Sequence, residues 1–327
     1  MRVAAIDIGT NTVLLLIAEV GDDEGVVPIV ERAEITRLGQ GVDRARTLAP
    51  EAVERTLACL RDYAAEIAAH EVARLDVVGT SAMRDAAAAT AGPGREFIER
   101  ARALLGVAPR VISGDEEASL AFAGGVAGLG LSGEVTAFDI GGGSTEIIRG
   151  QLERGAAQVS KRQSVDMGSV RLFERHVRAD PPSATEIAAV QAFVLDQLLP
   201  HAPPPAGQSL VGMAGTVTTV AAVARGIAPY DPAQIHGARL SLREIAETSR
   251  RLRQLPLAER KQLTGLEEKR ADVIPIGAVI LETIVGWAHA DEIVVSDRGV
   301  RWGVALQLAK SLLTSAAKEG QRHGPVT

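Results

Sequence analysis

Two aspartates stand where an apolar strand is predicted to end and a glycine turn to begin. Asp7 precedes Gly9 in the segment VAAIDIGTNT, and Asp139 precedes Gly141 in VTAFDIGGGST. A carboxylate at such a strand end can hold Mg²⁺ directly or through water. Glu146 follows on the outgoing strand and could face the same cleft, so we predict Asp7, Asp139 and Glu146 as metal ligands. The alternative for any one aspartate is a hydrogen bond that stabilises its turn.

The turns after these aspartates are suited to binding phosphate. A strand followed by a glycine-rich turn exposes successive backbone N–H groups, which form a concave site for phosphate oxygens. A further Gly-Thr pair opens a predicted helix, whose dipole also favours anions. The residues predicted to bind substrate in this way are Asn11, Thr12, Gly141, Gly142, Gly143, Ser144, Thr145, Gly215 and Thr216. A single turn of this kind is a weak signal, but several placed symmetrically favour a phosphate site.

A cluster of three carboxylates could supply a general base. Residues 113–118 read SGDEEA at a predicted helix start. Capping of that helix accounts for one or two acids better than for three. A free carboxylate in a phosphate cleft can position and deprotonate water for attack on phosphorus. Adjacent like charges would help to raise the pKa of that carboxylate.

Arg84 is a candidate clamp for phosphate. It lies in GTSAMRDA, which we predict to be the start of a helix after a Gly-Thr turn. A helix N-terminus already carries positive potential, so an arginine there is locally unfavourable and suggests an anionic partner. The guanidinium group can bind phosphate through two parallel hydrogen bonds.

Two of these patterns occur twice, in the same order. The hairpin at 3–17 returns at 135–148, and a strand, Gly-Thr turn and helix at 75–86 returns at 210–221. We therefore predict two similar α/β domains whose strands deliver polar turns to one shared cleft. The alternative is a chance similarity between short glycine-rich turns.

Helices are predicted between these landmarks from apolar residues at helical spacing. They cover residues 50–69, 95–105, 116–127 and 183–199. The segment 128–133 reads as a linker, so we place an N-terminal domain at 1–127 and a C-terminal domain at 128–327. From about residue 316 onward the chain is polar, and we expect a frayed tail.

Composition narrows the class of protein. The 327 residues are 46% hydrophobic but only 3% aromatic, which argues against base stacking on a single-stranded nucleic acid. The one cysteine, Cys59, allows no intramolecular disulfide and fits a reducing cytoplasm. No apolar stretch reaches the roughly 20 residues of a membrane span. We expect a soluble cytoplasmic protein that binds neither nucleic acid nor membrane.

The net charge of −6 means that a polyanion would need a local basic patch. The segment 239–270 could provide one, because it holds nine arginines and lysines: Arg239, Arg243, Arg250, Arg251, Arg253, Arg260, Lys261, Lys269 and Arg270. A solvated helix face is the equally weighted alternative.

Together these segments resemble the exopolyphosphatase / guanosine pentaphosphate phosphohydrolase (Ppx/GppA) family, within the superfamily of sugar kinases, Hsp70 and actin. The matching segments are DIGTNT (7–12), GTSAMRDA (79–86), ISGDEEA (112–118), DIGGGSTE (139–146), MGSVRL (167–172), GMAGTVTTVAA (212–222), RADVIPIGAVIL (270–281) and SDRGVRWG (296–303). They follow family order over nearly the whole chain. The resemblance implies two ribonuclease-H-like domains, of the actin-like ATPase kind, with the active site between them.

The resemblance also implies roles for single residues. Glu117 corresponds to the catalytic base of the family, and Arg84 to an arginine that contacts the phosphate chain. Asp139 and Glu146 match acidic residues that support metal and water. Gly141 to Thr145 match the phosphate loop, and Asn11 and Gly215-Thr216 match further phosphate contacts. Thr10 and Thr12 replace serines common in the family, which preserves the hydroxyl.

These roles predict an exopolyphosphatase that uses Mg²⁺, with Mn²⁺ as the alternative ion. Longer members carry an additional C-terminal helical domain, so its absence here favours short polyphosphate chains. Guanosine pentaphosphate is the alternative substrate, because the residues at the chemistry would be the same. An actin- or Hsp70-like ATP-binding module and a catalytically silent polyphosphate sensor are further alternatives. A homodimer would extend the basic surface and is the expected assembly.

Overall fold

The first half of the chain folds around a five-stranded sheet in the computed structural model, which describes residues 1–21, 25–87, 92–153 and 156–322. The strands are β1 (Arg2–Ile8), β2 (Thr12–Val20), β3 (Val26–Ile35), β4 (Arg74–Gly79) and β5 (Arg110–Val111), in the order β3-β2-β1-β4-β5. The first three strands pair antiparallel, and β4 pairs parallel with β1. The central strand β1 is buried along nearly its whole length, which its unbroken apolar run predicts.

The second half repeats this sheet and adds one strand. The strands are β6 (Gly133–Ile140), β7 (Thr145–Glu153), β8 (Ala156–Val165), β9 (Ser209–Met213), β10 (Arg239–Ser241) and β11 (Glu292–Val295), in the order β10-β11-β9-β6-β7-β8. Without β10 the order matches that of the first sheet. Even the register shift of the hairpin recurs, after Ile17 in β2 and after Arg149 in β7. The predicted internal repeat is therefore confirmed.

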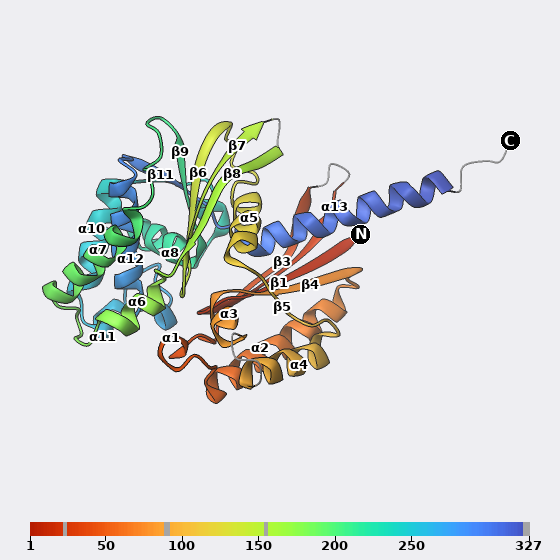
Figure 1. Ribbon diagram of the computed structural model, residues 1–327, viewed down its shortest axis with the longest axis horizontal. Helices are drawn as coiled ribbons and strands as arrows, with labels where there is room; N and C mark the ends of the chain where they lie inside the picture. The colour runs from red at the N-terminus through yellow and green to blue at the C-terminus, as the bar shows by residue number, and fades with distance from the viewer. Residues whose placement is uncertain (22–24, 88–91, 154–155, 323–327) are drawn as a thin grey trace.

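Helices cover the outer face of each sheet (Figure 1). In the first lobe these are α2 (Pro50–Ala69) and α4 (Pro93–Leu105), with the short α1 (Val42–Ala45) and α3 (Ser81–Ala87) nearer the second lobe. Proline at the first position of α2 and α4 suits a helix start, where its missing N–H costs nothing. The predicted helices at 50–69 and 95–105 are confirmed.

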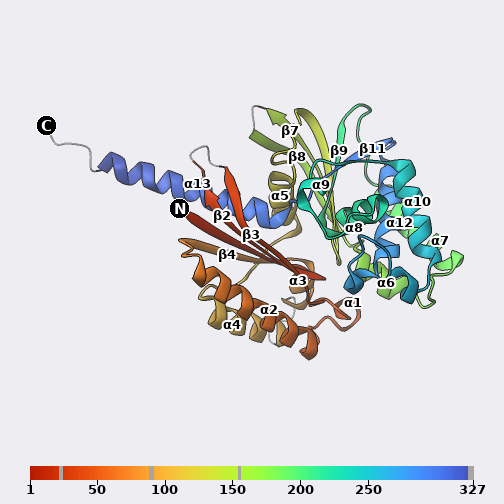
Figure 2. The same cartoon turned by 180° about the vertical axis from the view of Figure 1, so that it is seen from behind.

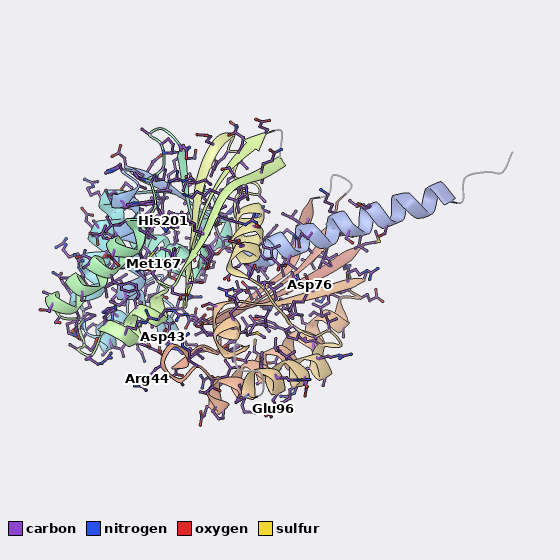
Figure 3. All side chains as sticks on the ribbon, viewed as in Figure 1. Asp43, Arg44, Asp76, Glu96, Met167 and His201 are labelled. Atoms are coloured by element: carbon purple, nitrogen blue, oxygen red, sulfur yellow. The ribbon has the colours of Figure 1, made fainter. Side chains whose placement is uncertain are left out.

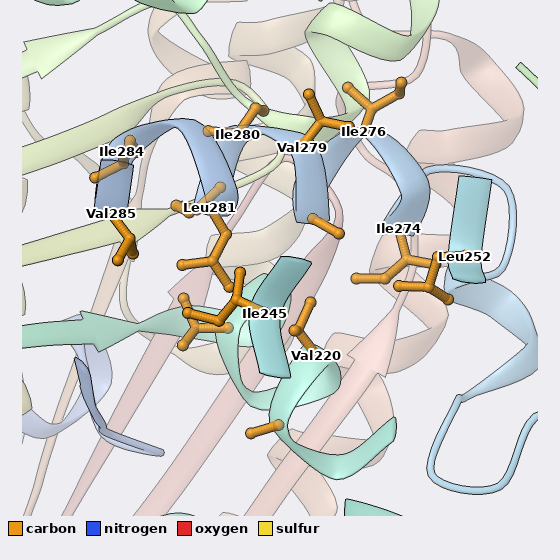
Figure 4. Packing of buried hydrophobic residues seen from close by; sticks show 14 of the residues in the cluster. Val220, Ile245, Leu252, Ile274, Ile276, Val279, Ile280, Leu281, Ile284 and Val285 are labelled. Carbon is orange, nitrogen blue, oxygen red and sulfur yellow. The ribbon is translucent and has the colours of Figure 1, made fainter. Parts of the chain in front are cut away.

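The outer helices of the second lobe enclose the largest apolar cluster. They are α6 (Ser169–His176), α7 (Ala184–Leu198), α8 (Ala214–Arg225), α9 (Pro232–Ile235), α10 (Leu242–Gln254), α11 (Leu257–Arg260), a 3₁₀ turn (Glu268–Arg270) and α12 (Ile274–Trp287). Figure 4 shows side chains of α12 packed against Val220 of α8 and against Ile245 and Leu252 of α10. This packing fixes α8, whose first turn reaches the cleft.

Two helices lie between the sheets, and each packs on the sheet of the other predicted domain. The helix α5 (Gly114–Gly125) belongs by sequence to the first half but packs on β6, β7 and β8. The C-terminal helix α13 (Val300–Arg322) packs on β1, β2 and β4 of the first sheet and against α5. A cut at residues 127 and 128 separates the sheets, but each lobe receives a helix from the other half (Figure 2).

Residues 316–322 are helical where the sequence predicts a frayed tail. The helix α13 continues to Arg322 and projects beyond the first sheet (Figures 1 and 2), while residues 323–327 lie outside the described part. None of the helices in the described ranges is both long and apolar enough to cross a membrane.

The crossing of α5 and α13 depends on two glycines. A Cβ atom on Gly124 would lie 2.1 Å from the carbonyl oxygen of Gly299, and one on Gly303 would lie 2.1 Å from that of Leu120. These distances are too short for any real contact, so the helices approach each other through bare backbone. The crossing joins the lobes beside the cleft, because Gly299 lines that cleft.

Gly303→Ala is therefore expected to lower the free energy of unfolding by about 1–3 kcal/mol, the usual cost of overpacking. Gly286→Ala is the matched control, because a Cβ there meets nothing within 4 Å in the helix α12. It should be neutral or stabilising by up to about 1 kcal/mol. Thermal and urea denaturation measure both. Equal stabilities for the two variants would contradict this account of the crossing.

Candidate active site

The turns that follow Asp7 and Asp139 meet directly. A Cβ atom on Gly142 would lie 3.1 Å from Cβ of Thr10, and one on Gly143 would lie 2.4 Å from Oγ of Ser81. Both turns line one cleft of about 580 Å³ that receives residues from each lobe. The shared cleft predicted from the repeat is therefore present, and its two walls come from equivalent strand ends.

Most of the predicted site residues lie together in this cleft. Its lining includes Asp7, Asn11, Thr12, Glu117, Asp139, Gly141, Gly142, Gly143, Ser144, Gly215 and Thr216. Three predicted residues do not line it, namely Arg84, Thr145 and Glu146. The hydroxyl of Thr145 instead donates to the backbone oxygen of Met167 at 2.7 Å, so it supports the turn from behind.

Glu146 lies beneath the cleft, next to Asp139. The two residues are direct partners across the antiparallel strands β6 and β7, where facing side chains are about 5 Å apart. Glu146 is only 1% exposed, and its Oε1 accepts a hydrogen bond from Ser164 at 2.7 Å. Its equivalent in the first lobe is Leu14, which faces Asp7. The second lobe alone carries this additional acid.

Of the three acids at the start of α5, only Glu117 enters the cleft. Asp115 is exposed, and Glu116 forms an ion pair with Arg110 at the surface. Arg84 donates from Nη1 to Oε2 of Glu117 at 2.5 Å and to the carbonyl oxygen of Ile112 at 3.1 Å. Burial raises the pKa of Glu117, although Arg84 and the Thr80 hydroxyl oppose the rise.

The prediction that Arg84 lies at the start of a helix is wrong. The helix α3 begins at Ser81, and Arg84 lies in its last turn, where a positive charge is favourable. Its observed partner is a carboxylate of the site. The geometry of Arg84 is that of a group that orients Glu117.

Burial and mutual repulsion disfavour charge on the acids of the site. Burial raises the pKa of Asp139 to about 7, with a further contribution from the Glu117 carboxylate. Burial, Glu117 and Asp139 together raise the pKa of Asp7 well above its ordinary value, against a smaller opposing effect of Arg301. The pKa of Glu146 is also raised well above normal, first by burial and then by Glu117 and Asp139.

These acids fit a divalent cation that they share with a phosphate ligand. Asp7 lines the cleft, and its Oδ1 is buried without a hydrogen-bond partner among the described residues. No group of three or more His, Cys, Asp or Glu side chains in the described ranges could hold a metal ion by itself. Mg²⁺ commonly takes one or two carboxylates and completes its shell with water and phosphate oxygens. Asp7 and Asp139 are suited to that role.

Several helices begin at the cleft and direct positive potential into it. The first turns of α8 and α13 line it through Gly215 and Val300, and the first turn of α5 contributes Glu117. The N–H groups at such helix ends favour anions. The cleft therefore suits phosphate despite its own carboxylates.

Arg270 is a cleft residue to which the sequence argument assigns no separate role. A Cβ on Gly215 would lie 2.3 Å from Nη1 of Arg270, so the guanidinium group covers the start of α8. Its Nη2 lies 3.4 Å from the hydroxyl of Thr12, and its Nε lies 3.4 Å from Glu267. These long contacts leave the group available to an anion between the two lobes. The sequence signal that could have identified Arg270 is its place in the family motif that begins RADV (270–273).

The other arginines and lysines of the segment 239–270 do not line the cleft in the described structure. Arg239, Arg253, Arg260 and Lys269 form ion pairs with Glu292, Glu282, Asp180 and Glu34, respectively. Arg250 and Arg251 lie beside a separate surface hollow between α8 and α10. Within the described residues, Arg270 is the only one of the nine arginines and lysines of this segment that lines the cleft.

Comparison with known proteins places this geometry in context. The model of the Ppx/GppA phosphatase family matches residues 16–312. Exopolyphosphatase 2 of Mycobacterium tuberculosis (strain CDC 1551 / Oshkosh) is 39% identical over 319 residues, which cover 94% of this chain and 98% of that protein.

Solved structures match over similar lengths. The crystal structure of the Aquifex aeolicus member of the Ppx/GppA family has 34% identity and a TM-score of 0.78, covering 96% of this chain and 98% of that one. An exopolyphosphatase from Cytophaga hutchinsonii has 26% identity and a TM-score of 0.83, covering 95% and 98%. These matches confirm the predicted fold of two α/β domains.

The raised pKa of Asp139 predicts how stability depends on pH in the metal-free protein. In the folded protein the Asp139 carboxyl has a pKa of about 7, whereas the ordinary pKa of an aspartate is 3.8. The stability present below pH 3.8 is therefore lost as pH rises through 7. At 1.36 kcal/mol per pKa unit, Asp139→Asn should be more stable than the wild type at pH 8 by up to about 4 kcal/mol.

Near pH 3 the two proteins should be almost equally stable, because the wild-type carboxyl is then mostly protonated in both the folded and the unfolded state. Thermal denaturation in EDTA at the two pH values measures the difference, and the exposed Asp115→Asn is the control. A variant less stable than the wild type at pH 8 would mean that interactions outweigh the cost of burying this carboxylate.

Proposed function

The chain belongs to the Ppx/GppA phosphatase family, and we propose that it is an exopolyphosphatase that hydrolyses the terminal phosphate of inorganic polyphosphate. The observation that carries the proposal is the meeting of two phosphate-binding turns beside Glu117, a buried carboxylate with a raised pKa. A relative with 39% identity over most of the chain is named an exopolyphosphatase, which supports the same activity.

In this proposal the chain's own groups bind the phosphates and position water. The N–H groups of both turns, the start of α8 and Arg270 bind the charged oxygens of the terminal units. Glu117, oriented by Arg84, accepts a proton from the attacking water. The water oxygen bonds to the terminal phosphorus as the bridging P–O bond breaks, and its electrons leave with the shortened chain. The products are orthophosphate and a chain shorter by one unit.

Mg²⁺ is the cation that we propose for the acids of the cleft. Asp7 and Asp139 would hold it, and Glu146 would act from behind Asp139 rather than as a direct ligand. When bound, the ion would neutralise phosphate oxygens and so lower the repulsion between substrate and carboxylates. Mn²⁺ prefers similar oxygen ligands and is the second ion to test.

Guanosine pentaphosphate is a second candidate substrate, favoured by the apolar part of the cleft. Beyond the turns, the cleft is lined by Ile227, Tyr230, Pro232 and Leu266. Apolar and aromatic side chains of this kind suit a nucleoside, whereas inorganic polyphosphate offers them no partner. The same compartment would serve an ATP-binding module, so nucleotide affinity has to be measured together with hydrolysis.

A phosphate-release assay tests the proposed function directly. Tripolyphosphate, long-chain polyphosphate, guanosine pentaphosphate and ATP are compared with Mg²⁺, with Mn²⁺ and with EDTA. We expect release from polyphosphate, faster per enzyme for short chains, and loss of activity in EDTA that Mg²⁺ restores. Faster release from guanosine pentaphosphate would favour the second candidate. Tight ATP binding without hydrolysis of polyphosphate would refute the first.

Glu117→Gln is expected to reduce kcat by at least about a hundredfold while leaving substrate affinity within a few fold, because general bases contribute 10²–10⁴-fold. The amide keeps the size of the side chain but cannot accept the proton of water. Glu116→Gln is the matched control, since Glu116 pairs with Arg110 outside the cleft. Near-normal turnover by the Glu117 variant would remove it from the mechanism.

A homodimer and a cytoplasmic location stay predictions from the sequence. Size-exclusion chromatography with light scattering measures the first.

A further inference from the structure

The helix α6 holds the carbonyl groups of the three consecutive glycines, Gly141 to Gly143, in the second phosphate-binding turn. The backbone N–H of Ser169 donates to the oxygen of Gly141 at 2.9 Å, and the N–H groups of Val170 and Arg171 donate to that of Gly142 at 2.9 and 3.0 Å. The side chain of Arg171 completes the set, because its Nε donates to the oxygen of Gly143 at 2.6 Å.

This arrangement fixes the direction of the N–H groups in the turn. In a trans peptide the C=O and the following N–H point to opposite sides. With the three carbonyl groups held toward α6, the N–H groups of Gly142, Gly143 and Ser144 point away from it. None of these N–H groups has a hydrogen-bond partner within the described ranges. They are the donors that a phosphate group needs.

The approach of α6 to the turn is very close. A Cβ on Gly168 would lie 2.3 Å from the carbonyl carbon of Gly142 and 2.4 Å from the nitrogen of Gly143. Glycine is therefore required at the position that precedes α6. The segment MGSVRL, to which the sequence argument assigns no role, supplies both this glycine and Arg171.

Arg171 also binds the first lobe. Its Nη2 donates to Asp85 at 2.6 Å and to the Ser81 hydroxyl at 3.2 Å, and its Nη1 pairs with Asp43. Asp43, which belongs to α1 and is labelled in Figure 3, lies where the two lobes meet and pairs with Arg171 of α6. Only 4% of Arg171 is exposed. One buried guanidinium group thus touches the phosphate turn of one lobe and the helices α1 and α3 of the other.

The carbonyl groups of the first turn are held by backbone N–H groups instead of a side chain. The carbonyl oxygen of Thr10 accepts from the N–H of Gly39, and that of Asn11 accepts from Thr36 and Arg37, all within the first lobe. Within the described residues, the carbonyl groups of the second turn alone are held by a side chain, and the other contacts of that side chain depend on the position of the opposite lobe.

We propose that Arg171 is a positioning residue that aims the N–H groups of the second phosphate turn and makes their direction depend on closure of the two lobes. The inference rests on the proposed function, since it assigns these N–H groups to the terminal phosphate. When the lobes are together, Asp43 and Asp85 hold the guanidinium group where its Nε meets Gly143. When they separate, the turn loses this contact and its aim at the substrate.

Only arginine can make these contacts together. Its planar fork presents five N–H donors in fixed directions, whereas lysine presents one ammonium group on a flexible stem. Arg171→Lys keeps the charge for the two aspartates but cannot also reach Gly143 and Ser81. The matched control is Arg175→Lys on the same helix, because Arg175 shares Asp43 but does not contact the turn.

We expect Arg171→Lys to lower kcat/KM for tripolyphosphate about a hundredfold, the usual cost of misplacing a binding group by about 1 Å. Both a lower kcat and a higher KM should contribute, and the affinity for inorganic pyrophosphate measured by calorimetry should fall. Arg175→Lys should stay within about threefold of the wild type in all three values. Circular dichroism and thermal midpoints establish that both variants are folded.

Equal losses in the two variants, or a normal Arg171→Lys enzyme, would overturn the proposal. If that variant does not fold, Asp85→Asn tests the link from the other lobe and should lower kcat/KM about tenfold; no change there would also overturn it. If the wild type releases no phosphate from any substrate, the proposed function fails, and pyrophosphate affinity still decides whether Arg171 aims the turn.

Discussion

The central constraint on this structure is that like charges must coexist in one cleft. Asp7, Glu117 and Asp139 line it, Glu146 lies directly behind, and the proposed ligand is a polyanion. Burial is the first cause of the raised pKa of all four acids, and repulsion from neighbouring carboxylates further raises the pKa of Asp7, Asp139 and Glu146. The protein offsets this with backbone N–H groups and helix starts rather than with many cations. The unpartnered Oδ1 of Asp7 marks where a cation would lower the remaining cost.

The duplicated sheet brings these groups together without any long loop. In both halves the strand with the aspartate lies between its hairpin partner and a parallel strand, β4 or β9. The turn after the aspartate and the start of α3 or α8 therefore emerge at the same edge of each sheet. The helices α5 and α13 then pack each half against the other through Gly124 and Gly303. The facing of the two turns follows from repeated topology and from this exchange of helices.

The sequence predicts these elements well because their signals are local. The hairpins around Asp7 and Asp139 follow from apolar runs broken by Asp-Ile-Gly, and the helix at 50–69 follows from its apolar spacing. The direction of a side chain, in contrast, depends on residues that are far away in the sequence. Thr145 and Glu146 do not line the cleft, because β7 has already begun there and their side chains bond to Met167 and Ser164 instead. The sequence places Arg84 near a helix start, because it contains no clear signal that the helix α3 is only two turns long. Arg270 shares a basic stretch with arginines that form pairs elsewhere.

Because the two sheets are equivalent, differences between equivalent positions in the two turns show what each turn requires. Leu14 stands where the second lobe has Glu146, and the first turn carries Thr10 and Asn11 where the second has bare glycines. The glycines are needed because α6 and the first lobe both press against that turn, leaving no room for a Cβ on Gly143. The first turn needs no such approach, since its own loop at 36–39 holds its carbonyl groups. That loop also contacts the second lobe, because Arg37 pairs with Asp272 and donates to the carbonyl oxygen of Lys269. The first turn is thus held by backbone N–H groups, whereas the second is held by the Arg171 side chain, which contacts both lobes. Under the proposed function, the second turn binds phosphate fully only when the lobes are together.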